Sequence, residues 1–416
     1  MKSILEQPKV TVSQGRVMLF DLALGGHHGN YIRYLIEHWQ GHNLSGSLDI
    51  VVLPQFLEFH RDVVEMVAEL ANDRLRLVPL KPEEAASLES RNSFRQRTKR
   101  NFQEWDLLCR YARQLGSTEC LLMYFDTCEL PLAVSKAAPC PISGIYFKPT
   151  FHYCSLPGDR PTRKDKIQRW REKVTLKRIL LHPQLKTLFC LDPIAIEPLK
   201  EFQSQAEIVY LPDPVELEPV IDTSITKESL GIDAHRLVLI FFGALDRRKG
   251  LHQLVAALNQ LPPEICRYLS ILFVGKGSSS ELSQIEPELN RLKTTTPLQI
   301  IQHYQFVPEA AVASYFQLAD LVLAPYQKHV GMSGILLLAA AANKPVLSSD
   351  YGLMGELVRR YDLGLSLDST SAEQIALNIT QFVLNYPNLP EDRQRRRQFA
   401  SEHSVMEYAT TIFQHL

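Results

Sequence analysis

A basic loop follows one apolar run in the second half of the chain. The segment Phe241–Leu251 reads FFGALDRRKGL, with Gly243 at the expected end of a strand and a helix expected soon after. Positive side chains beside the start of a helix lie where backbone N–H groups also favour an anion. We therefore predict that Lys249 binds a diphosphate and contributes to catalysis, assisted by Arg247 or Arg248. A solvated basic turn is the alternative if the segment is taken alone.

A turn rich in small residues precedes a helix further along. In Tyr326–Val346, YQKHVGMSGILLLAAAANKPV, a run of Leu and Ala follows Gly331, Met332, Ser333 and Gly334. Small residues let backbone N–H groups approach an anion at the positive end of a helix. We predict that these four residues bind phosphate and that Ser333 caps the helix. A buried, tightly packed helix is an alternative that is compatible with this role.

A third glycine loop follows the first expected strand. Leu24–Leu35 reads LGGHHGNYIRYL, so Gly25 and Gly26 leave room for a ligand or another domain to approach the backbone. The loop lacks the GxGxxG pattern, and a dinucleotide site is therefore not favoured. His27 and His28 are candidates to contact phosphate or acceptor hydroxyls, although an exposed histidine pair is equally compatible with the sequence.

Two polar residues follow apolar strands of the first half. Asp126 comes after LLMYF and His152 comes shortly after GIYFKP, and both are candidates to contact a sugar or an acceptor. The alternative for each is a polar residue at a strand end that the backbone satisfies. The seven cysteines show no zinc-ligand spacing, and no DxD-like pair lies in a suitable loop. We therefore expect no metal site.

Alternating strands and helices position these residues. Nearly all-apolar runs such as LDIVVLP and ECLLMYFD predict parallel strands covered on both faces. The segment LPDPVELEPVIDTS has no periodicity and predicts a linker. The sequence thus predicts an α/β protein with two Rossmann-like domains that face each other across a cleft. We expect an N-terminal domain at 1–210, a linker at 211–225, a C-terminal domain at 226–390 and a last helix at 391–416 that packs back toward the first domain.

Composition limits the classes of partner. The 416 residues carry a formal net charge of −1, so no global field attracts nucleic acid, which we do not expect as a partner. The N-terminal stretch has no apolar core typical of a signal peptide, and no apolar run is long enough to span a membrane. A cytoplasmic protein is the default expectation.

One basic stretch suggests a surface role. In Arg160–Arg178, the apolar residues Ile167, Trp170, Val174 and Leu176 are interleaved with Lys and Arg. Such a helix can lie on an anionic membrane, with Trp at the interface, which would place the protein at the inner face of the membrane. A docking surface for a lipid-linked or acidic acceptor and a plain solvated helix are the alternatives.

The segments above, in this order and spacing, resemble the retaining glycosyltransferases of the GT-B class, specifically family 4. FGALDRRKGLHQLVAAL is similar to that family's strand–KG–helix element, and GMSGILLLAAAANKPVL to its donor-site helix. YLPDPVEL falls at the family's interdomain turn, and SDYGLMGELV is similar to its Gly-x-x-x-Glu segment. The resemblance covers nearly all of the second domain. In the first domain it rests on the glycine loop and the strand order.

The resemblance implies that the second domain binds a nucleoside-diphosphate sugar as co-substrate and that the first binds a carbohydrate or lipid-linked acceptor, as in polysaccharide or glycolipid synthesis. It implies retention of configuration. Because no DxD-like pair lies in a suitable loop, we expect no divalent cation, and we expect no cofactor. The residues implied at the donor site are Lys249 and Gly331–Gly334 at the diphosphate, Gly26 approaching from the first domain, the backbone near Phe306 and Val307 at the base, and Glu356 at the edge of the pocket.

The chain departs from the family at two acidic positions. The family usually has two glutamates eight residues apart around the donor helix, and this chain has Val330 and Leu338 there. The local candidates to replace them are Lys328, His329 and Ser333. The departure keeps two other functions open: a nucleotide-sugar binding protein of GT-B shape with impaired catalysis, and a GT-B nucleotide-sugar epimerase.

Overall fold

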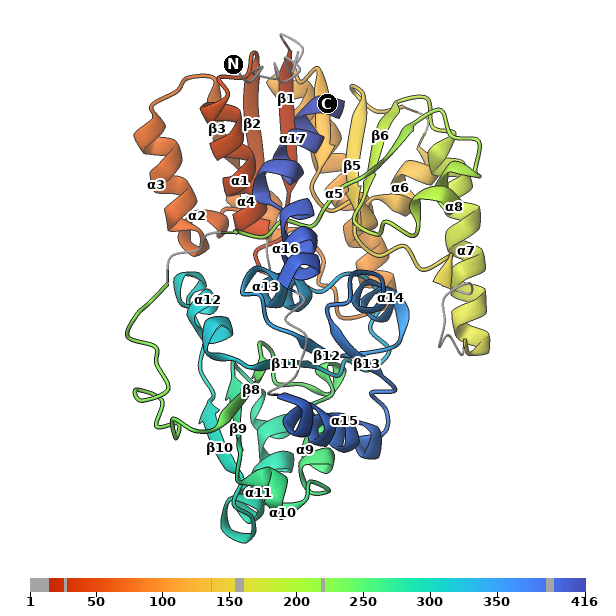
Figure 1. The fold of residues 1–416 in the computed structure, drawn as a ribbon. Coiled ribbons are helices and arrows are strands. Elements are labelled where there is room, and N and C mark those ends of the chain that lie inside the picture. The colour runs from red at the N-terminus through yellow and green to blue at the C-terminus, as the bar shows by residue number, and fades with distance from the viewer. Residues whose placement is uncertain (1–14, 26–27, 136, 154–160, 218–220, 387–392) are drawn as a thin grey trace, which may run out of the picture. The chain divides into compact units, whose positions relative to one another are not determined.

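The structure is a computed structural model that describes residues 15–25, 28–135, 137–153, 161–217, 221–386 and 393–416 (Figure 1). The chain divides into two compact units. Unit 1 takes Met1–His152, Pro161–Pro212 and Val405–Leu416, and unit 2 takes Tyr153–Arg160 and Asp213–Ser404. The main division, after Pro212, falls in the segment expected to be a linker.

Unit 1 is built on a parallel sheet of seven strands in the order β3-β2-β1-β4-β5-β6-β7. All seven were expected from their apolar runs. The strands are β1 (Arg16–Asp21), β2 (Ser47–Val52), β3 (Leu75–Pro79), β4 (Glu119–Leu122), β5 (Ile142–Tyr146), β6 (Leu185–Cys190) and β7 (Glu207–Tyr210). The helices are α1 (His28–Gly41), α2 (Phe56–Phe59), α3 (Arg61–Leu70), α4 (Pro82–Ala86), α5 (Phe94–Leu115), η1 (Phe125–Thr127), α6 (Glu129–Val134), α7 (Arg163–Leu180), α8 (Ile196–Lys200) and α17 (Val405–His415).

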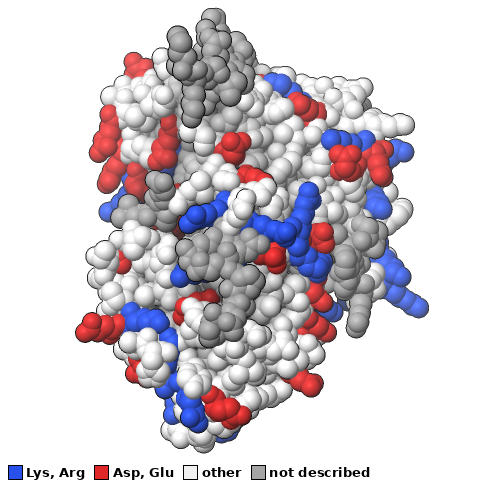
Figure 2. All heavy atoms as spheres, in the orientation of Figure 1, with Lys and Arg blue, Asp and Glu red and all other residues white. Residues whose placement is uncertain are grey.

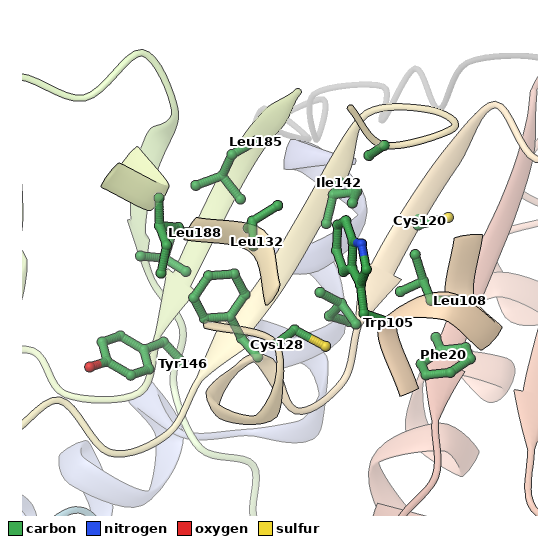
Figure 3. Packing of buried hydrophobic residues seen from close by; sticks show 14 of the residues in the cluster. Phe20, Trp105, Leu108, Cys120, Cys128, Leu132, Ile142, Tyr146, Leu185 and Leu188 are labelled. Carbon is green, nitrogen blue, oxygen red and sulfur yellow. The ribbon is translucent and has the colours of Figure 1, made fainter. Parts of the chain in front are cut away.

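Each face of this sheet has its own apolar core, because successive residues of a strand point to opposite faces. From β1, Phe20 packs into one cluster with Trp105 of α5, and Figure 3 shows both among the side chains of that cluster. Leu19 packs into the other cluster, with α1 and with Phe413 of α17. The strands are therefore apolar at nearly every position, as parallel strands covered on both faces require.

Unit 2 is built on a second parallel sheet, of six strands in the order β10-β9-β8-β11-β12-β13. The strands are β8 (Leu237–Phe242), β9 (Leu269–Val274), β10 (Gln299–His303), β11 (Leu321–Ala324), β12 (Val346–Ser349) and β13 (Gly364–Leu367). The helices are η3 (Arg247–Lys249), α9 (Leu251–Leu258), α10 (Pro263–Cys266), α11 (Ser279–Thr295), α12 (Glu309–Leu318), α13 (Gly334–Ala341), α14 (Gly352–Tyr361), α15 (Ala372–Asn385) and α16 (Arg393–Glu402).

The expected last helix, 391–416, is wrong as one element. It forms two helices, α16 in unit 2 and α17 in unit 1. Between them the backbone makes a bridge from Ser404 to Val215, and the Val215 N–H donates to the His403 carbonyl at 2.7 Å. The backbone groups that pair these two distant segments would form hydrogen bonds within the helix if the helix were continuous.

Both sheets contain a switch point, where the connections turn from one direction across the sheet to the other. In unit 1 it lies between β1 and β4, and in unit 2 between β8 and β11. Ligands of such sheets bind beyond the carboxyl ends of the strands at the switch point. The residues that follow these four strands are therefore the first candidates for function in each unit.

Candidate functional sites at the two switch points

In unit 2, Lys249 lies against the end of β8. Its Nζ donates to the Phe242 carbonyl at 2.9 Å, and the side chain is largely buried. Gly243 has a φ of 99°, and a Cβ on it would lie 2.4 Å from that Nζ. Glycine is therefore needed here twice, for its backbone conformation and for the space that the ammonium occupies.

The turn that carries Lys249 is fixed by Asp246. The Asp246 carboxylate accepts the backbone N–H of Lys249 at 2.9 Å and so caps the 3₁₀ turn η3. Gly250 ends this turn with a φ of 84°, and a Cβ there would meet the Pro325 carbonyl at 2.0 Å. The RRKG sequence therefore encodes a tight turn held close to the end of β11.

The structure distinguishes the two arginines of this turn. Arg247 contacts α11, where its Nε lies 3.3 Å from Glu281 and its guanidinium also reaches Gln284. Arg248 lies with its guanidinium carbon 5.5 Å from the centre of the Tyr326 ring. Lys249 Nζ lies at the same distance, 5.5 Å, from that centre. Of the two arginines, Arg248 is therefore the one that shares a neighbour with Lys249.

Tyr326 connects the two segments that the sequence singled out in unit 2. Its hydroxyl is hydrogen-bonded to the hydroxyl of Ser333 at 2.9 Å, and its ring lies beside Arg248 and Lys249. The next residue, Gln327, donates its backbone N–H to the Arg248 carbonyl at 2.8 Å. The sequence reasoning did not single out Tyr326, although an aromatic residue just beyond β11, at the switch point, was a signal for it.

Ser333 begins α13, but its side chain does not cap the helix. It occupies the N-cap position, and its hydroxyl bonds to Tyr326 instead of accepting a helix N–H. The expected side-chain cap is therefore wrong. Within the part of the chain that the structure describes, the backbone N–H groups of Met332, Ser333, Gly334 and Ile335 have no hydrogen-bond acceptor. These are the unpaired donors that helix N-termini offer to anions.

The Gly331 amide is already occupied. It donates to the hydroxyl of Tyr153 at 2.9 Å, and Gly331 has a φ of 95°. The Tyr153 ring also lies against Gly352, where a Cβ would come within 3.0 Å of it. Of the residues expected to contact phosphate through their amides, Gly331 therefore has an intramolecular partner in this structure.

The residues expected at the base and at the pocket edge also belong to unit 2. Phe306, just beyond β10, is 68% exposed, and the Lys276 Nζ lies 5.5 Å from the centre of its ring. Val307 is half-buried beside it. Glu356, on α14, forms an ion pair with Arg359 at 3.0 Å.

No carboxylate replaces the family's glutamates at their own positions. Leu338 is half-buried within α13, and Val330 is half-buried before the turn. The Nε2 of His329 lies 3.3 Å from the Met332 carbonyl, and Lys328 is exposed with a φ of 48°. Ser333, the third candidate replacement, bonds to Tyr326.

In unit 1, His152 and Asp126 have structural partners. The His152 side chain is 1% exposed, and its Nε2 lies 3.0 Å from Asp192. Asp126 accepts backbone N–H groups from Phe147 at 2.9 Å and Lys148 at 3.1 Å, while burial raises its pKa to about 6. Asp126 therefore agrees with the alternative stated above, a polar residue that the backbone satisfies, whereas His152 lies against the side chain of Asp192. A contact of either residue with a sugar or an acceptor stays a prediction.

The switch point of unit 1 opens into a cavity of about 450 Å³. Gly25 is exposed nearby, whereas Gly26 and His27 lie outside the described residues. His28 lines the cavity, and its Nδ1 lies 2.7 Å from the Asp21 carboxylate at the end of β1. His28 is thus the member of the predicted histidine pair that the structure places in a polar site.

No metal site is formed by the described residues: nowhere among them do three His, Cys, Asp or Glu side chains come together in a way that could hold an ion. The cysteines among these residues are buried thiols.

Comparison with known proteins distinguishes the two units. Residues 222–403, which lie in unit 2, match the family model described as Glycosyl transferases group 1. The chain is 26% identical over 167 residues to the D-inositol 3-phosphate glycosyltransferase of Rhodococcus opacus (strain B4). It is 27% identical over 169 residues to the protein of the same name from Rhodococcus jostii (strain RHA1). Each match covers 39% of this chain and 36% of the relative, so the chain spans about a third of the relatives it matches.

Solved structures resemble the whole chain. Anabaena HepE in complex with UDP superposes with a TM-score of 0.65 at 12% identity, covering 95% of this chain and 98% of that one. Sucrose-phosphate synthase from Thermosynechococcus elongatus gives a TM-score of 0.68 at 15% identity, covering 96% and 97%. At these identities the likeness establishes the fold, which is the α/β fold with two parallel sheets that the sequence predicted.

Proposed function

We propose that this chain, a group 1 glycosyltransferase with the GT-B fold, transfers a sugar from a nucleoside-diphosphate sugar to an acceptor hydroxyl, with retention and without a metal ion. One observation carries the proposal. At the switch point of unit 2, Lys249 and Arg248 lie beside the ring of Tyr326, which bonds to Ser333 at the start of α13. Two cations and a set of unpaired amides suit a diphosphate.

The chemistry that this site favours is departure of the nucleoside diphosphate. As the bond between the sugar C1 and the phosphate oxygen breaks, negative charge grows on the diphosphate. The ammonium of Lys249 has three N–H donors and uses one on the Phe242 carbonyl, so the others remain for this charge. Charge-assisted hydrogen bonds contribute about 1.5–3 kcal/mol each, or roughly ten- to a hundredfold in rate if made only in the transition state.

Retention follows if the acceptor attacks on the face from which the diphosphate departs. The acceptor oxygen then forms the new bond to C1, and its proton moves to the departing phosphate oxygen, so that atoms and charge balance. No protein nucleophile is required. Lys249, Arg248 and the dipole of α13 neutralise the charge on the diphosphate. In metal-dependent enzymes a divalent cation has this role.

The relatives and the surface of unit 2 support the donor and acceptor classes that we propose. HepE was solved with UDP, so uridine nucleotides are the first donors to test. The exposed ring of Phe306 suits stacking against a base. The matched relatives are named for an inositol phosphate acceptor, and we extend this to carbohydrate or lipid-linked acceptors, bound by unit 1.

A nucleotide-sugar binding protein without catalysis is the second candidate. One observation favours it: Val330 and Leu338 replace the glutamates that the family uses near the sugar and ribose, and Ser333 is already bonded to Tyr326. A binding protein of this kind would hold UDP-sugar at the same Lys249 site. Only turnover separates the two candidates.

The test is a transfer assay with UDP-, GDP- and ADP-sugars and a panel of sugar and polyol acceptors, in buffer with EDTA. The proposal expects a glycoside product, with the anomeric configuration of the donor when analysed by NMR. If UDP binds but no combination of donor and acceptor gives transfer or donor hydrolysis, the binding protein is favoured. An inverted product would contradict retention. Activity abolished by EDTA and restored by a cation would contradict metal independence.

We also propose that α7 lies on an anionic membrane surface. Its residues Ile167, Trp170 and Val174 are 59%, 65% and 43% exposed and follow the spacing of one helix face. The opposite face packs into unit 1 through Leu176 and Ile179. Leu176 therefore does not belong to the exposed stripe with which the sequence grouped it.

Two rows of cations flank this exposed stripe. At about 100° per residue, Lys164, Arg171 and Arg178 fall on one side and Lys166, Lys173 and Lys177 on the other. Basic side chains project along the edge of unit 1 where α7 lies (Figure 2). Arg160, where the basic stretch begins, lies outside the described residues. Apolar residues between two cationic rows suit acyl chains beneath anionic headgroups. Among the described helices, none is both long enough and apolar enough to cross a membrane.

Vesicle co-sedimentation tests this surface. We expect binding to vesicles of phosphatidylcholine with phosphatidylglycerol, weaker binding to phosphatidylcholine alone, and loss of binding as salt increases. Trp170→Ser should weaken binding at least several-fold, because interfacial Trp burial is lost. Leu384→Ser, which removes an equally exposed apolar residue from α15 in unit 2, is the matched control. Equal binding to both vesicles, or equal losses in both variants, would exclude the assignment.

A further inference from the structure

We infer that Cys120 and Cys140 form a modification site, at which hydrogen peroxide joins the two sulfurs in a reversible disulfide. The two Sγ atoms lie 3.3 Å apart, and both side chains are buried in the same apolar cluster of unit 1. A disulfide bond is about 2.0 Å long, so the sulfurs have to approach each other by about 1.3 Å. The site is independent of the proposed function, because it needs neither a nucleotide nor a sugar.

The backbone holds the two cysteines next to each other. Cys120 lies on β4, and its register partner on the parallel strand β5 is Ile142 (Figure 3). Cys140 comes two residues before Ile142. The Cys120 N–H donates to the Pro141 carbonyl at 3.0 Å, which fixes the residue after Cys140 against β4. The contact between the sulfurs is therefore set by the register of the sheet.

The chain on the other side of Cys140 is anchored as well. The side-chain amide of Gln184, just before β6, accepts the Ala138 N–H and donates to the Ala138 carbonyl at 2.6 Å. Pro139 and Pro141 restrict the backbone on both sides of Cys140, because the proline ring fixes φ at about −65°. The segment that carries Cys140 is thus attached to β4 and to the residue before β6, so its thiol stays beside that of Cys120.

The two sulfurs differ in reactivity. Cys140 is 6% exposed, whereas Cys120 is fully buried. The hydrogen bond from Cys120 lowers the pKa of the Cys140 thiol, and the same contact, together with burial, raises the pKa of Cys120 well above its usual value. The thiolate is the form that attacks an oxidant. Cys140 is therefore the sulfur that reacts first, and Cys120 is the one that completes the disulfide.

The other cysteines that the structure describes lack this arrangement. Burial raises the pKa of each of them, to about 11 for Cys109 and about 12 for Cys128. The sulfurs of Cys128, Cys190 and Cys266 contact oxygen atoms, at 3.6–3.8 Å, and not another sulfur. Cys154 lies outside the described residues. The selectivity of the site thus comes from the contact between two sulfurs and the lowered pKa of one of them.

The oxidation consists of two steps that balance. In the first, the Cys140 sulfur attacks one oxygen of hydrogen peroxide, the O–O bond breaks, and the other oxygen leaves as water with the thiol proton. In the second, the Cys120 sulfur attacks the resulting sulfenic acid, the S–O bond breaks, and the hydroxyl leaves as a second water with the proton of Cys120. The two thiols lose two electrons, which the peroxide gains. Dithiothreitol reverses the product by thiol–disulfide exchange.

The disulfide acts on the stability of unit 1. It closes the stretch of chain from Cys120 to Cys140, which contains η1 and α6, and a closed loop limits the conformations of the unfolded chain. Cys120 is near the start of β4 and Cys140 precedes β5, so the link lies at the amino ends of the strands. Ligands of such sheets bind at the opposite, carboxyl ends. We therefore expect the modification to stabilise the unit and to leave its ligand sites unchanged.

Peptide mapping of the full chain tests the site. The reduced protein is treated with one equivalent of hydrogen peroxide, its free thiols are alkylated, and trypsin then separates 114–136 from 137–163. We expect these two peptides to be joined by a disulfide that fragmentation assigns to Cys120 and Cys140 and that dithiothreitol removes. The absence of this link, a link through other cysteines, or an equal yield with peroxide added in concentrated urea would overturn the inference.

Single variants separate the two sulfurs. Cys128→Ser, which changes the other cysteine of the peptide that contains Cys120, is the matched control and should keep the link. Cys120→Ser should lose the link and leave a sulfenic acid on Cys140 that dimedone traps. Cys140→Ser should lose the link and give no dimedone adduct on Cys120. No adduct on Cys140 in the first of these two variants, or an adduct on Cys120 in the second, would contradict the order of attack.

Urea unfolding followed by tryptophan fluorescence measures the effect on unit 1, which contains the three tryptophans of the chain. Oxidised wild type should unfold at a higher urea concentration than reduced wild type, whereas peroxide should not move the transition of Cys120→Ser. The same shift in both proteins, or no shift in wild type whose disulfide has formed, would overturn the stabilising role.

Discussion

Gly243 and Lys249 depend on each other at the level of single residues. The ammonium occupies the space where a side chain on residue 243 would begin, and Gly243 adopts a backbone conformation that other residues rarely adopt. The same glycine lies close to Gly275, where a Cβ would meet the Gly243 carbonyl at 1.9 Å. Gly243 is therefore packed closely against both Lys249 and Gly275, so a larger residue at position 243 has to displace the lysine.

We predict that Gly243→Ala lowers UDP affinity about tenfold, because the new methyl group displaces the Lys249 ammonium. Gly231→Ala is the matched control, since residue 231 also has a positive φ, 67°, but has open space where its Cβ would lie. Both variants carry backbone strain of about 1 kcal/mol. Calorimetric titration with UDP should show a loss in the first variant only. Equal affinities would mean that the ammonium does not contact the diphosphate.

At this scale the sequence predicted some placements and missed others for a physical reason. The place of Lys249 in a tight turn after β8 could be predicted because that turn is local, from Asp246 to Gly250. Tyr326 was missed because its contacts with Arg248 and Lys249 join it to a segment far away in the sequence. The pairing of His152 with Asp192 could not be predicted, because Asp192 follows another strand and spacing within one segment does not reveal that pair.

At the level of elements, the packing of α1 on α17 includes a buried histidine. His38 stacks on His42, with ring centres 4.1 Å apart, and on Phe413, at 5.7 Å. Burial, together with the charge of His42, lowers the pKa of His38 from 6.5 to about 4. Among the described residues, its Nε2 has no hydrogen-bond partner. A proton on this ring is therefore unfavourable in the folded state.

This packing predicts a loss of stability in acid. Between pH 6.5 and 4 the unfolded chain binds a proton at His38 that the folded chain does not, so stability falls as pH falls through that window. At pH 5 the loss relative to pH 7 is at most about 2 kcal/mol for this group. His38→Phe should remove that part of the pH dependence, whereas His235→Gln, which changes an exposed histidine, should keep it.

Tryptophan fluorescence during urea unfolding can measure this effect, because Trp39, Trp105 and Trp170, the three tryptophans of the chain, all lie in unit 1. If the free energy of unfolding differs between pH 7 and pH 5 by the same amount in wild type and in His38→Phe, the histidine is not the source of the pH dependence.

Elements with long apolar or periodic patterns could be predicted, and short or polar ones could not. The sequence reasoning omitted α11, whose buried residues Ile285, Leu289 and Leu292 are separated by charged positions and follow Ser278, its cap. It also omitted β13, a four-residue strand. That strand pairs with β12 because Gly364 lacks a Cβ, which would lie 2.2 Å from the Val346 carbonyl.

At the scale of the whole molecule, unit 1 is discontinuous in sequence. It depends on α17, from the end of the chain, for a part of the apolar core that includes Tyr408, Ile412 and Phe413. The sequence predicted the returning segment but not that α16 stays with unit 2. That division depends on the crossing between Val215 and Ser404, which no local pattern encodes.

We therefore predict that Phe413→Ala destabilises unit 1 by about 3–5 kcal/mol, the usual cost of removing a buried aromatic ring. Phe59→Ala is the control, because Phe59 lies in unit 1 and is 69% exposed. The tryptophan transition in urea should move to lower concentration in Phe413→Ala and stay near that of wild type in Phe59→Ala. Transitions of wild type and Phe413→Ala at the same urea concentration would show that α17 is dispensable for unit 1.

The binding of a nucleoside diphosphate through Lys249 is tested most directly by calorimetric titration of UDP into wild type, Lys249→Ala and Lys293→Ala. Lys293 is an exposed lysine of α11 outside the site. Wild type and Lys293→Ala should bind UDP with equal affinity, and Lys249→Ala should lose about ten- to a hundredfold, the value of one charge-assisted contact. Equal affinity in all three proteins, or no binding of UDP, GDP or ADP by wild type, would contradict the account.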